Sequence, residues 1–328
     1  MFAVVEHQNL RTMTTTFKIH KYISPMCDFG FKKIFKESGK KQLLIRPLNA
    51  IFGLDIADLE IGESERLGQT PEDRKASFDL FCTSADGRRF IVEVQLMRQE
   101  HFLERALYYA TFPISESARK DGAEAWNFDF PPVFVLGLLN FDFRGLSGHE
   151  DGASADQFIH RFSLRDDDTG ERMTDRLRFA FLEVQRFDKG LEECESFEEK
   201  FLYMMKNLPI FVGTPAPWEA DPYFVEMLRE AEYARMSREE KAQYRESMRQ
   251  SWDYQNTIDY ARKEGRQQGH AQGLAQGLEE GRTEGQAEKA RAIARRMLAK
   301  GMPIETIVEM TEVDEGQVRA LAEEPVKK

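Results

Sequence analysis

The sequence predicts an α/β fold, with α+β as the alternative, in which helices flank a mixed sheet of about four or five strands. Residues 76–84 and 88–96 alternate apolar and polar side chains around Ala85-Asp86-Gly87, a pattern typical of a β-hairpin. Residues 133–140 form a continuous apolar run, which indicates a strand buried on both faces. Apolar residues recur at helical spacing from Asp28 onwards, so helices and strands are interspersed along the chain.

The other elements follow from the same patterns. Two helices are expected near the N-terminus, one starting at Asp28 and one over residues 43–52, where Pro47 marks a first turn or a kink. Further elements are expected in chain order: a strand over 55–65, a long helix over 97–120 with a bend or break at Pro113, and a strand over 176–184.

The register of the hairpin decides where its acidic residues lie. If the loop has three residues with Gly87 in the left-handed conformation, Ser84 lies opposite Arg88 and Asp79 lies opposite Glu93. A two-residue turn would pair Asp79 with Val94 and put carboxylates on the apolar side, so the hydrophobic pattern favours the longer loop. One face is then expected to carry Phe78, Leu80, Cys82, Phe90, Val92 and Val94, and the other Ser77, Asp79, Phe81, Ile91, Glu93 and Gln95.

Two carboxylates placed opposite each other have Cβ atoms about 5 Å apart and repel unless a positive charge lies between them. A divalent cation is the natural occupant, and Mg²⁺ prefers such oxygen ligands. The register therefore predicts a metal site at Asp79 and Glu93.

Several motifs occur in the order found in one known family. They are DFGFKKIF (28–35), LNAIFG (48–53), ERALYY (104–109), PPVFVLGLLNFDF (131–143) and TDRLRFAFLEVQRF (174–187), together with the hairpin and its Glu93-Val94-Gln95. Over roughly residues 24–190 the chain resembles the bacterial PD-(D/E)xK nuclease family transposases, also called recombination-promoting nucleases. The resemblance implies a restriction-endonuclease-like core and Mg²⁺-dependent cleavage of DNA, with Mn²⁺ expected to substitute.

The resemblance also implies roles for individual residues. The metal ligands would be Asp79, Glu93 and the backbone carbonyl of Val94, and Asp28 is either a third contributor or only a helix N-cap. The wider superfamily has a Lys two residues after the Glu, where this chain has Gln95, which can orient a water molecule but carries no charge. Arg105 would clamp a phosphate or instead form a structural ion pair.

A basic stretch lies near the N-terminus. Lys32, Lys33 and Lys36 fall on the helix that begins at Asp28, where they could meet a DNA phosphate backbone or simply form a solvated helix face. The net charge of −11 argues against indiscriminate nucleic-acid binding. No apolar run approaches the ~20 residues of a membrane span, and no secretion signal is evident, so we expect a cytoplasmic protein without membrane contact.

We expect five segments: a loose tail over 1–15, the nuclease domain over 16–215, a helical arm over 216–262, a glycine-rich segment over 263–288 and a small module over 289–328. Glycine recurs every fourth residue from Gly265 to Gly285, either on a helix that self-associates through a glycine stripe or in a flexible linker. Residues 289–328 should form three short helices shaped like a helix-turn-helix. Because residues 303–324 hold seven acids and one base, Arg319, a packing or oligomerisation module is favoured over DNA reading.

Two functions follow as hypotheses. The first is a metal-dependent DNA endonuclease acting in recombination or on mobile elements. The second is a catalytically weak or inactive protein that binds DNA or oligomerises and keeps a relic nuclease core. DNA and a second copy of the chain, joined through the C-terminal helical region, are the expected partners.

Overall fold

The structure is a computed structural model of the 328-residue chain. It describes residues 20–63, 65–66, 76–120, 129–143, 157–213, 215 and 218–323, so the expected N-terminal tail lies outside the described residues. The chain divides into two compact units, Met1–Ser251 and Trp252–Lys328.

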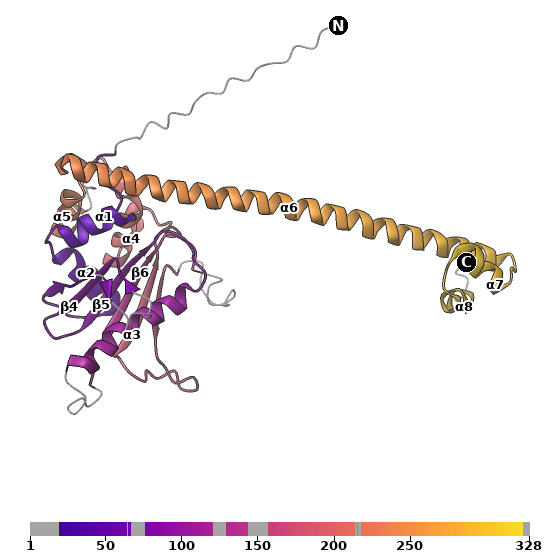
Figure 1. The fold of residues 1–328 in the computed structure, drawn as a ribbon, viewed down its shortest axis with the longest axis horizontal. Helices are drawn as coiled ribbons and strands as arrows, with labels where there is room; N and C mark the ends of the chain where they lie inside the picture. Colours follow the sequence, from indigo (N-terminus) through magenta and orange to yellow (C-terminus); the bar gives the residue numbers. More distant parts are fainter. Residues whose placement is uncertain are drawn as a thin grey trace, which may run out of the picture. The chain divides into compact units, whose positions relative to one another are not determined.

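A mixed six-stranded sheet forms the centre of the first unit (Figure 1), which confirms the predicted fold class with more strands than the four or five expected. The strand order is β1-β4-β5-β6-β8-β7; β5, β6 and β8 run parallel, and the other neighbours are antiparallel. The strands are β1 (Leu59–Ile61), β4 (Leu80–Ser84), β5 (Arg89–Gln95), β6 (Val133–Leu139), β7 (Ile159–Ser163) and β8 (Leu177–Glu183). The short strands β2 (Glu65–Arg66) and β3 (Ala76–Ser77) form a separate pair.

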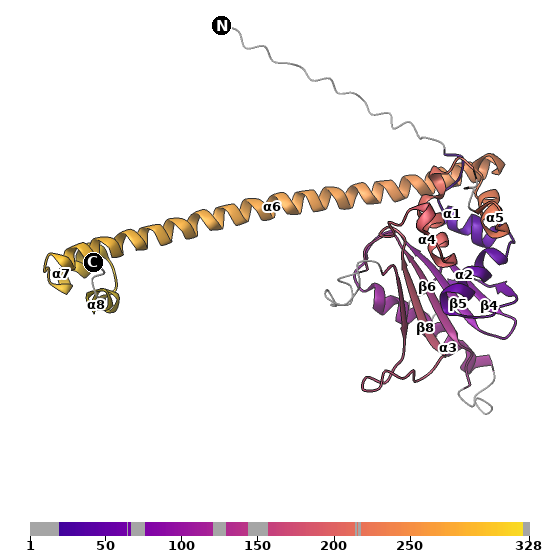
Figure 2. The same ribbon diagram turned by 180° about the vertical axis from the view of Figure 1, so that it is seen from behind.

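Helices cover both faces of the sheet (Figures 1 and 2). On one face lie α1 (Asp28–Lys32) with its π-helical continuation Lys33–Glu37, α2 (Gln42–Phe52), α4 (Phe197–Asn207) and α5 (Pro222–Glu230); on the other lies α3 (Phe102–Lys120). Short 3₁₀ turns cover Leu191–Glu193, Leu208–Ile210 and Tyr233–Arg235. Pro47 and Pro113 both lie inside helices. The helix expected from residue 97 begins only at Phe102, after His101 with its φ of 59°.

The sheet separates two apolar clusters. Leu80, Cys82, Phe90 and Val92 face the larger cluster under α1, α2, α4 and α5, while Phe81 and Ile91 face the cluster under α3. This alternation matches the predicted faces, except at Phe78. Phe78 was expected beside Leu80 but packs on the α3 side, with its ring centroid 5.1 Å from that of Tyr109, because the strand is interrupted between β3 and β4.

Core residues of the first unit continue beyond residue 215. Trp218, Phe224, Met227 and Tyr244 are buried in the larger cluster, so α5 and the first turns of α6 (Arg238–Ala299) belong to the same core as the sheet.

The second unit contains the rest of α6 together with α7 (Ile304–Thr311) and α8 (Glu315–Glu323). All six regularly spaced glycines from Gly265 to Gly285 lie within α6, so the segment is a helix rather than a flexible linker. Ala294, Ile307, Val313 and Val318 form a small core at the end of α6. None of the helices that the structure describes is long and apolar enough to cross a membrane.

Candidate active site

The hairpin has the predicted three-residue loop. Gly87 adopts a φ of +84°, and the backbone N–H of Ser84 donates to the carbonyl of Arg88 at 2.9 Å. The ladder pairs Leu80 with Val92 and Phe81 with Ile91, so the predicted register is confirmed. Asp79 immediately precedes β4, and continuing the register by one residue beyond the Leu80–Val92 pair places it opposite Glu93.

Asp79 and Glu93 meet at the end of this ladder. The backbone N–H of Val94 donates to Oδ2 of Asp79 at 2.6 Å, and the backbone N–H of Asp79 donates to Oε1 of Glu93 at 3.3 Å. The Gln95 amide donates to the other Glu93 oxygen, Oε2, at 3.3 Å. The structure therefore brings together Asp79, Glu93 and Gln95, the three residues predicted for the reaction.

Burial and charge shift the protonation of both acids. Burial, reinforced by the negative charge of Asp79, raises the pKa of Glu93 to about 8. Burial also raises the pKa of Asp79, and the negative charge of Asp28 raises it further. The hydrogen bond from the Val94 N–H and the positive charges of Lys32 and Arg105 lower this pKa in part. A pair of carboxyl groups that resists ionisation in this way favours a cation as a partner.

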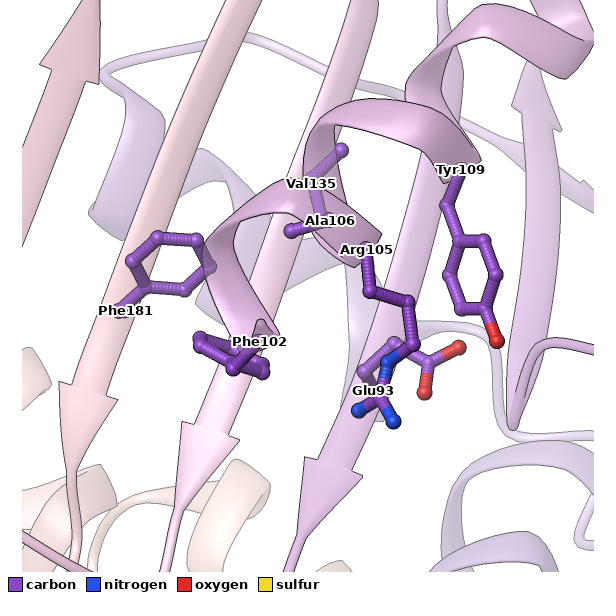
Figure 3. Close-up of a pocket in the computed structure, with 8 residues that line it drawn as sticks. Glu93, Phe102, Arg105, Ala106, Tyr109, Val135 and Phe181 are labelled. Carbon is purple, nitrogen blue, oxygen red and sulfur yellow. The ribbon is translucent and has the colours of Figure 1, made fainter. Parts of the chain in front are cut away.

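A pocket opens on the α3 side of Glu93 (Figure 3). Arg105 and Tyr109 extend from α3 toward the Glu93 carboxylate. The Arg105 guanidinium lies 5.9 Å from the ring centroids of both Phe102 and Tyr109, and it donates a hydrogen bond to Gln99. This arrangement places a positive charge in the lining of the pocket, beside Glu93.

The floor of the pocket depends on a residue that the sequence reasoning did not single out. Gly137 of β6 is the register partner of Glu93, and a Cβ there would lie 2.7 Å from Cδ1 of Phe181. The signal was available, because a lone glycine inside an apolar strand often marks a close approach of another group.

The charged residues of α1 and of its π-helical continuation differ in their partners. Lys32 forms an ion pair with Asp28 (Nζ–Oδ1 2.7 Å), whereas Lys33 pairs with Glu240 of α6. Lys36 is half-buried in the π-helical turn. The N-cap of α1 is Cys27, not Asp28, since its Sγ accepts the Gly30 N–H at 3.3 Å. Across the parts of the chain that the structure describes, no three His, Cys, Asp or Glu side chains gather in a group that could hold a metal ion.

Residues 25–261 match the family described as PD-(D/E)XK nuclease family transposase. The chain belongs to this family. Residues 287–323 match a second description, the C-terminal HTH domain of the Rpn/YhgA-like nuclease family, which agrees with the helix-turn-helix shape expected there. No curated protein and no solved structure matches the chain significantly.

The carboxylate pair Asp79 and Glu93 lies within the residues that match the nuclease family. The family match spans β5, α3, β6 and β8, which are the elements that build the pocket. It supports a nuclease role associated with recombination. It also ends close to where the first unit ends, so the first turns of α6 belong to the match as well as to the core.

Proposed function

We propose that this protein is a cytoplasmic, metal-dependent DNA endonuclease that hydrolyses phosphodiester bonds during recombination or on mobile elements. The observation that carries the proposal is the Asp79–Glu93 pair. The half-buried Asp79, just before β4, approaches the buried Glu93 of β5, and the pKa values of both are raised, so holding them together costs folding free energy. A binding site for a divalent cation explains that cost.

The donor set fits a hard cation such as Mg²⁺, with Mn²⁺ as a substitute. Asp79 and Glu93 would provide carboxylate oxygens. The backbone N–H of Val94 points toward Asp79. Because the N–H and carbonyl of one strand residue point the same way, the Val94 carbonyl oxygen also points there and would be a third ligand of the ion. Asp28 would contribute only by leaving its ion pair with Lys32. When bound, the ion would supply Lewis acidity and a more acidic water molecule.

The chain's own residues would position the substrate. Gln95 would hold the attacking water by hydrogen bonding, since its amide already lies beside the Glu93 carboxylate. Arg105 would bind a phosphate oxygen and offset charge that develops in the transition state. Lys32, Lys33 and Lys36 are candidates for contact with the DNA backbone, although Lys33 would first have to leave Glu240.

Plasmid cleavage by the purified full chain tests the proposal, with Mg²⁺, Mn²⁺ and Ca²⁺ compared. We expect cleavage with Mg²⁺ and Mn²⁺, and its loss in Asp79→Asn and Glu93→Gln, which keep the size of the side chains. Activity that survives in both folded variants would remove this site from the mechanism.

A relic nuclease core is the second candidate, and Gln95 is the observation that favours it, because an amide cannot replace the charge of a lysine. Calorimetric titration with Mn²⁺ separates the two. A protein that binds DNA but neither binds Mn²⁺ nor cleaves would be the relic.

We also propose that the C-terminal region joins two copies of the chain and contacts DNA through its HTH domain. Each glycine in α6 costs the helix about 1 kcal/mol relative to alanine, and none of the six has an atom within 4 Å of the place where a Cβ would lie. Leu274 and Leu278 between them are 58% and 67% exposed. A second helix packed on this surface would offset that cost.

Sedimentation equilibrium of the full chain checks the association. Gly273→Leu and Gly277→Leu should weaken it, whereas Ala275→Leu, about 200° around the helix from each, should not. A wild-type chain that stays monomeric at micromolar concentration would exclude self-association through α6.

A further inference from the structure

Residues 259–289 of α6 form a long helical stretch in which every residue is exposed. A helix that is polar on every side needs either many side-chain pairs along its own length or a partner. The six glycines weaken this stretch further, because each disfavours the helix relative to alanine. The composition of the stretch therefore points to a partner that covers one of its faces.

The glycines divide the surface of this stretch into two flanks of different charge. We call the line of glycines at every fourth residue from Gly265 to Gly285 the glycine stripe. The residues that directly precede and follow each glycine lie about 100° to either side of the stripe. The preceding residues form an acidic flank, which consists of Glu264, Gln268, Gln272, Gln276, Glu280 and Glu284. The following residues form a basic flank, which consists of Arg266, His270, Leu274, Leu278, Arg282 and Gln286.

The two flanks decide how a second copy of the helix would fit. If two helices pack stripe against stripe and run in the same direction, the acidic flank of each meets the basic flank of the other along both edges. If they run in opposite directions, each flank meets its own copy, so arginines approach arginines and glutamates approach glutamates. Charge complementarity therefore favours the parallel pair. In register, Arg266 approaches Glu264 of the second copy, and Arg282 approaches Glu280 and Glu284.

The charged side chains of the flanks are held only weakly within their own chain. The Arg282 guanidinium lies 3.4 Å from Glu279, and both side chains are about two-thirds exposed. The Gln268 amide donates to Glu264 at 3.5 Å. Exposed contacts of this kind contribute under about 1 kcal/mol each. They can therefore be exchanged for contacts with a second copy.

We infer that two copies of the chain pair through α6 in parallel and in register, with the acidic flank of each copy against the basic flank of the other. This inference rests on the proposed association of two copies, and it adds the direction and the contacts of that association. The small core of the HTH domain includes Ala294, Met297 and Leu298 of α6. A parallel pair therefore brings both HTH domains to the same end of the helices, as in dimeric HTH proteins that bind two half-sites of one DNA.

Single cysteines on the glycine stripe test the direction. In a parallel pair residue 269 lies opposite its own copy, so Gly269→Cys in the full chain should be joined into a dimer by a short bifunctional maleimide. Gly281→Cys should behave in the same way. In an antiparallel pair centred on the stripe, the two copies of residue 269 would be about 18 Å apart along the axis. Neither variant would then crosslink alone, whereas a mixture of the two would.

The matched control is Ala271→Cys, which lies about 200° around the helix from Gly269 and should stay uncrosslinked. The native cysteines are buried and should not react in the folded chain; they are Cys27, Cys82 and Cys194.

Charge exchange tests the contacts. In sedimentation equilibrium, Arg266→Glu should weaken the association about tenfold, because like charges then meet at both edges of the pair. The double variant Arg266→Glu/Glu264→Arg exchanges the two charges and should restore the association to within about threefold of the wild type. In an antiparallel pair Arg266→Glu would face Arg282 and would instead tighten the association. Lys263→Glu is the matched control, since it makes the same change of charge about 200° around the helix from Gly265 and should leave the association unchanged.

The outcomes are distinct. A wild-type chain that stays monomeric at micromolar concentration would overturn the proposed association and this inference with it. A wild-type chain that pairs, but whose cysteine variants crosslink only as a mixture, would overturn the inference alone. The same holds if Arg266→Glu pairs as tightly as the wild type or more tightly. Plasmid cleavage tests the nuclease proposal separately from all of these results.

Discussion

Asp79 Oδ2 accepts a 2.6 Å hydrogen bond from the backbone N–H of Val94. The ladder between β4 and β5 ends at Leu80 and Val92, so beyond it the Asp79 side chain takes the place of a backbone acceptor. The same carboxylate thus has a structural task and a proposed metal-binding task. The two tasks can be separated by the choice of substitution.

Asp79→Asn and Asp79→Ala should differ in stability. An asparagine oxygen still accepts the Val94 N–H, so Asp79→Asn should fold with nearly wild-type stability while losing Mn²⁺ affinity. Alanine leaves the half-buried N–H of Val94 without its partner, which costs about 1 kcal/mol. Urea unfolding measures the stability of the two variants, and calorimetric titration measures their Mn²⁺ affinity. Equal stability of the two variants would show that the bond to Val94 contributes nothing.

The pKa of Glu93 predicts how stability depends on pH in the metal-free protein. An ordinary glutamate in the unfolded chain has a pKa near 4.5, and in the folded protein the value is about 8. Between these values the folded state binds more protons than the unfolded state. The free energy of unfolding should therefore fall by a few kcal/mol as pH rises from about 4.5 to about 8, and should level off above that pH. Urea unfolding at a series of pH values checks this.

Glu93→Gln is the control for that experiment, and its stability should not decline over the same pH range. Mn²⁺ should offset the decline in the wild type, because binding requires the ionised carboxylate and releases a proton. A wild-type stability that rises across the range would contradict the assigned direction of the shift.

The hairpin shows how much the sequence could reveal. Alternation around Ala85-Asp86-Gly87 was enough to fix the register, because a one-residue slip would have turned every side chain to the wrong face. The strand break at Phe78 and Asp79 was not predictable in this way. It places Phe78 under α3 against Tyr109, a contact between residues thirty-one positions apart that no local pattern encodes.

Local patterns failed in the same way elsewhere. Strand β7 was missed, because His160 and Arg161 interrupt its short apolar pattern and its pairing with β8 is what holds it. The ion pair of Lys33 with Glu240 likewise depends on how the start of the chain packs against α6. The sequence shows that a lysine is present, but only the fold shows which acid it pairs with.

Gly137 is predicted to be irreplaceable in the floor of the pocket. In Gly137→Ala the new Cβ would lie 2.7 Å from the Phe181 ring, next to Glu93, and overpacking of this kind costs about 1–3 kcal/mol. Because the Phe181 ring lines the pocket and would have to shift, cleavage should also slow. The control is Gly213→Ala at an exposed bend, where an added Cβ has open space, so stability and cleavage should stay near the wild-type values. Denaturation and cleavage assays of both variants check the contrast.

Glu183, at the end of β8, is predicted to be a structural acid rather than a catalytic one. It is fully buried, accepts the backbone N–H of Phe143, and lies 2.9 Å from both His160 Nε2 and Arg186 Nε. Glu183→Gln removes the charge that balances the partly buried Arg186, and breaking a buried ion pair costs about 3–5 kcal/mol. Glu315→Gln breaks an exposed pair with Arg319 and should cost under about 1 kcal/mol. Because Glu183 does not line the pocket, the folded fraction of Glu183→Gln should still cleave DNA; a fully folded but inactive variant would instead place this acid in the reaction.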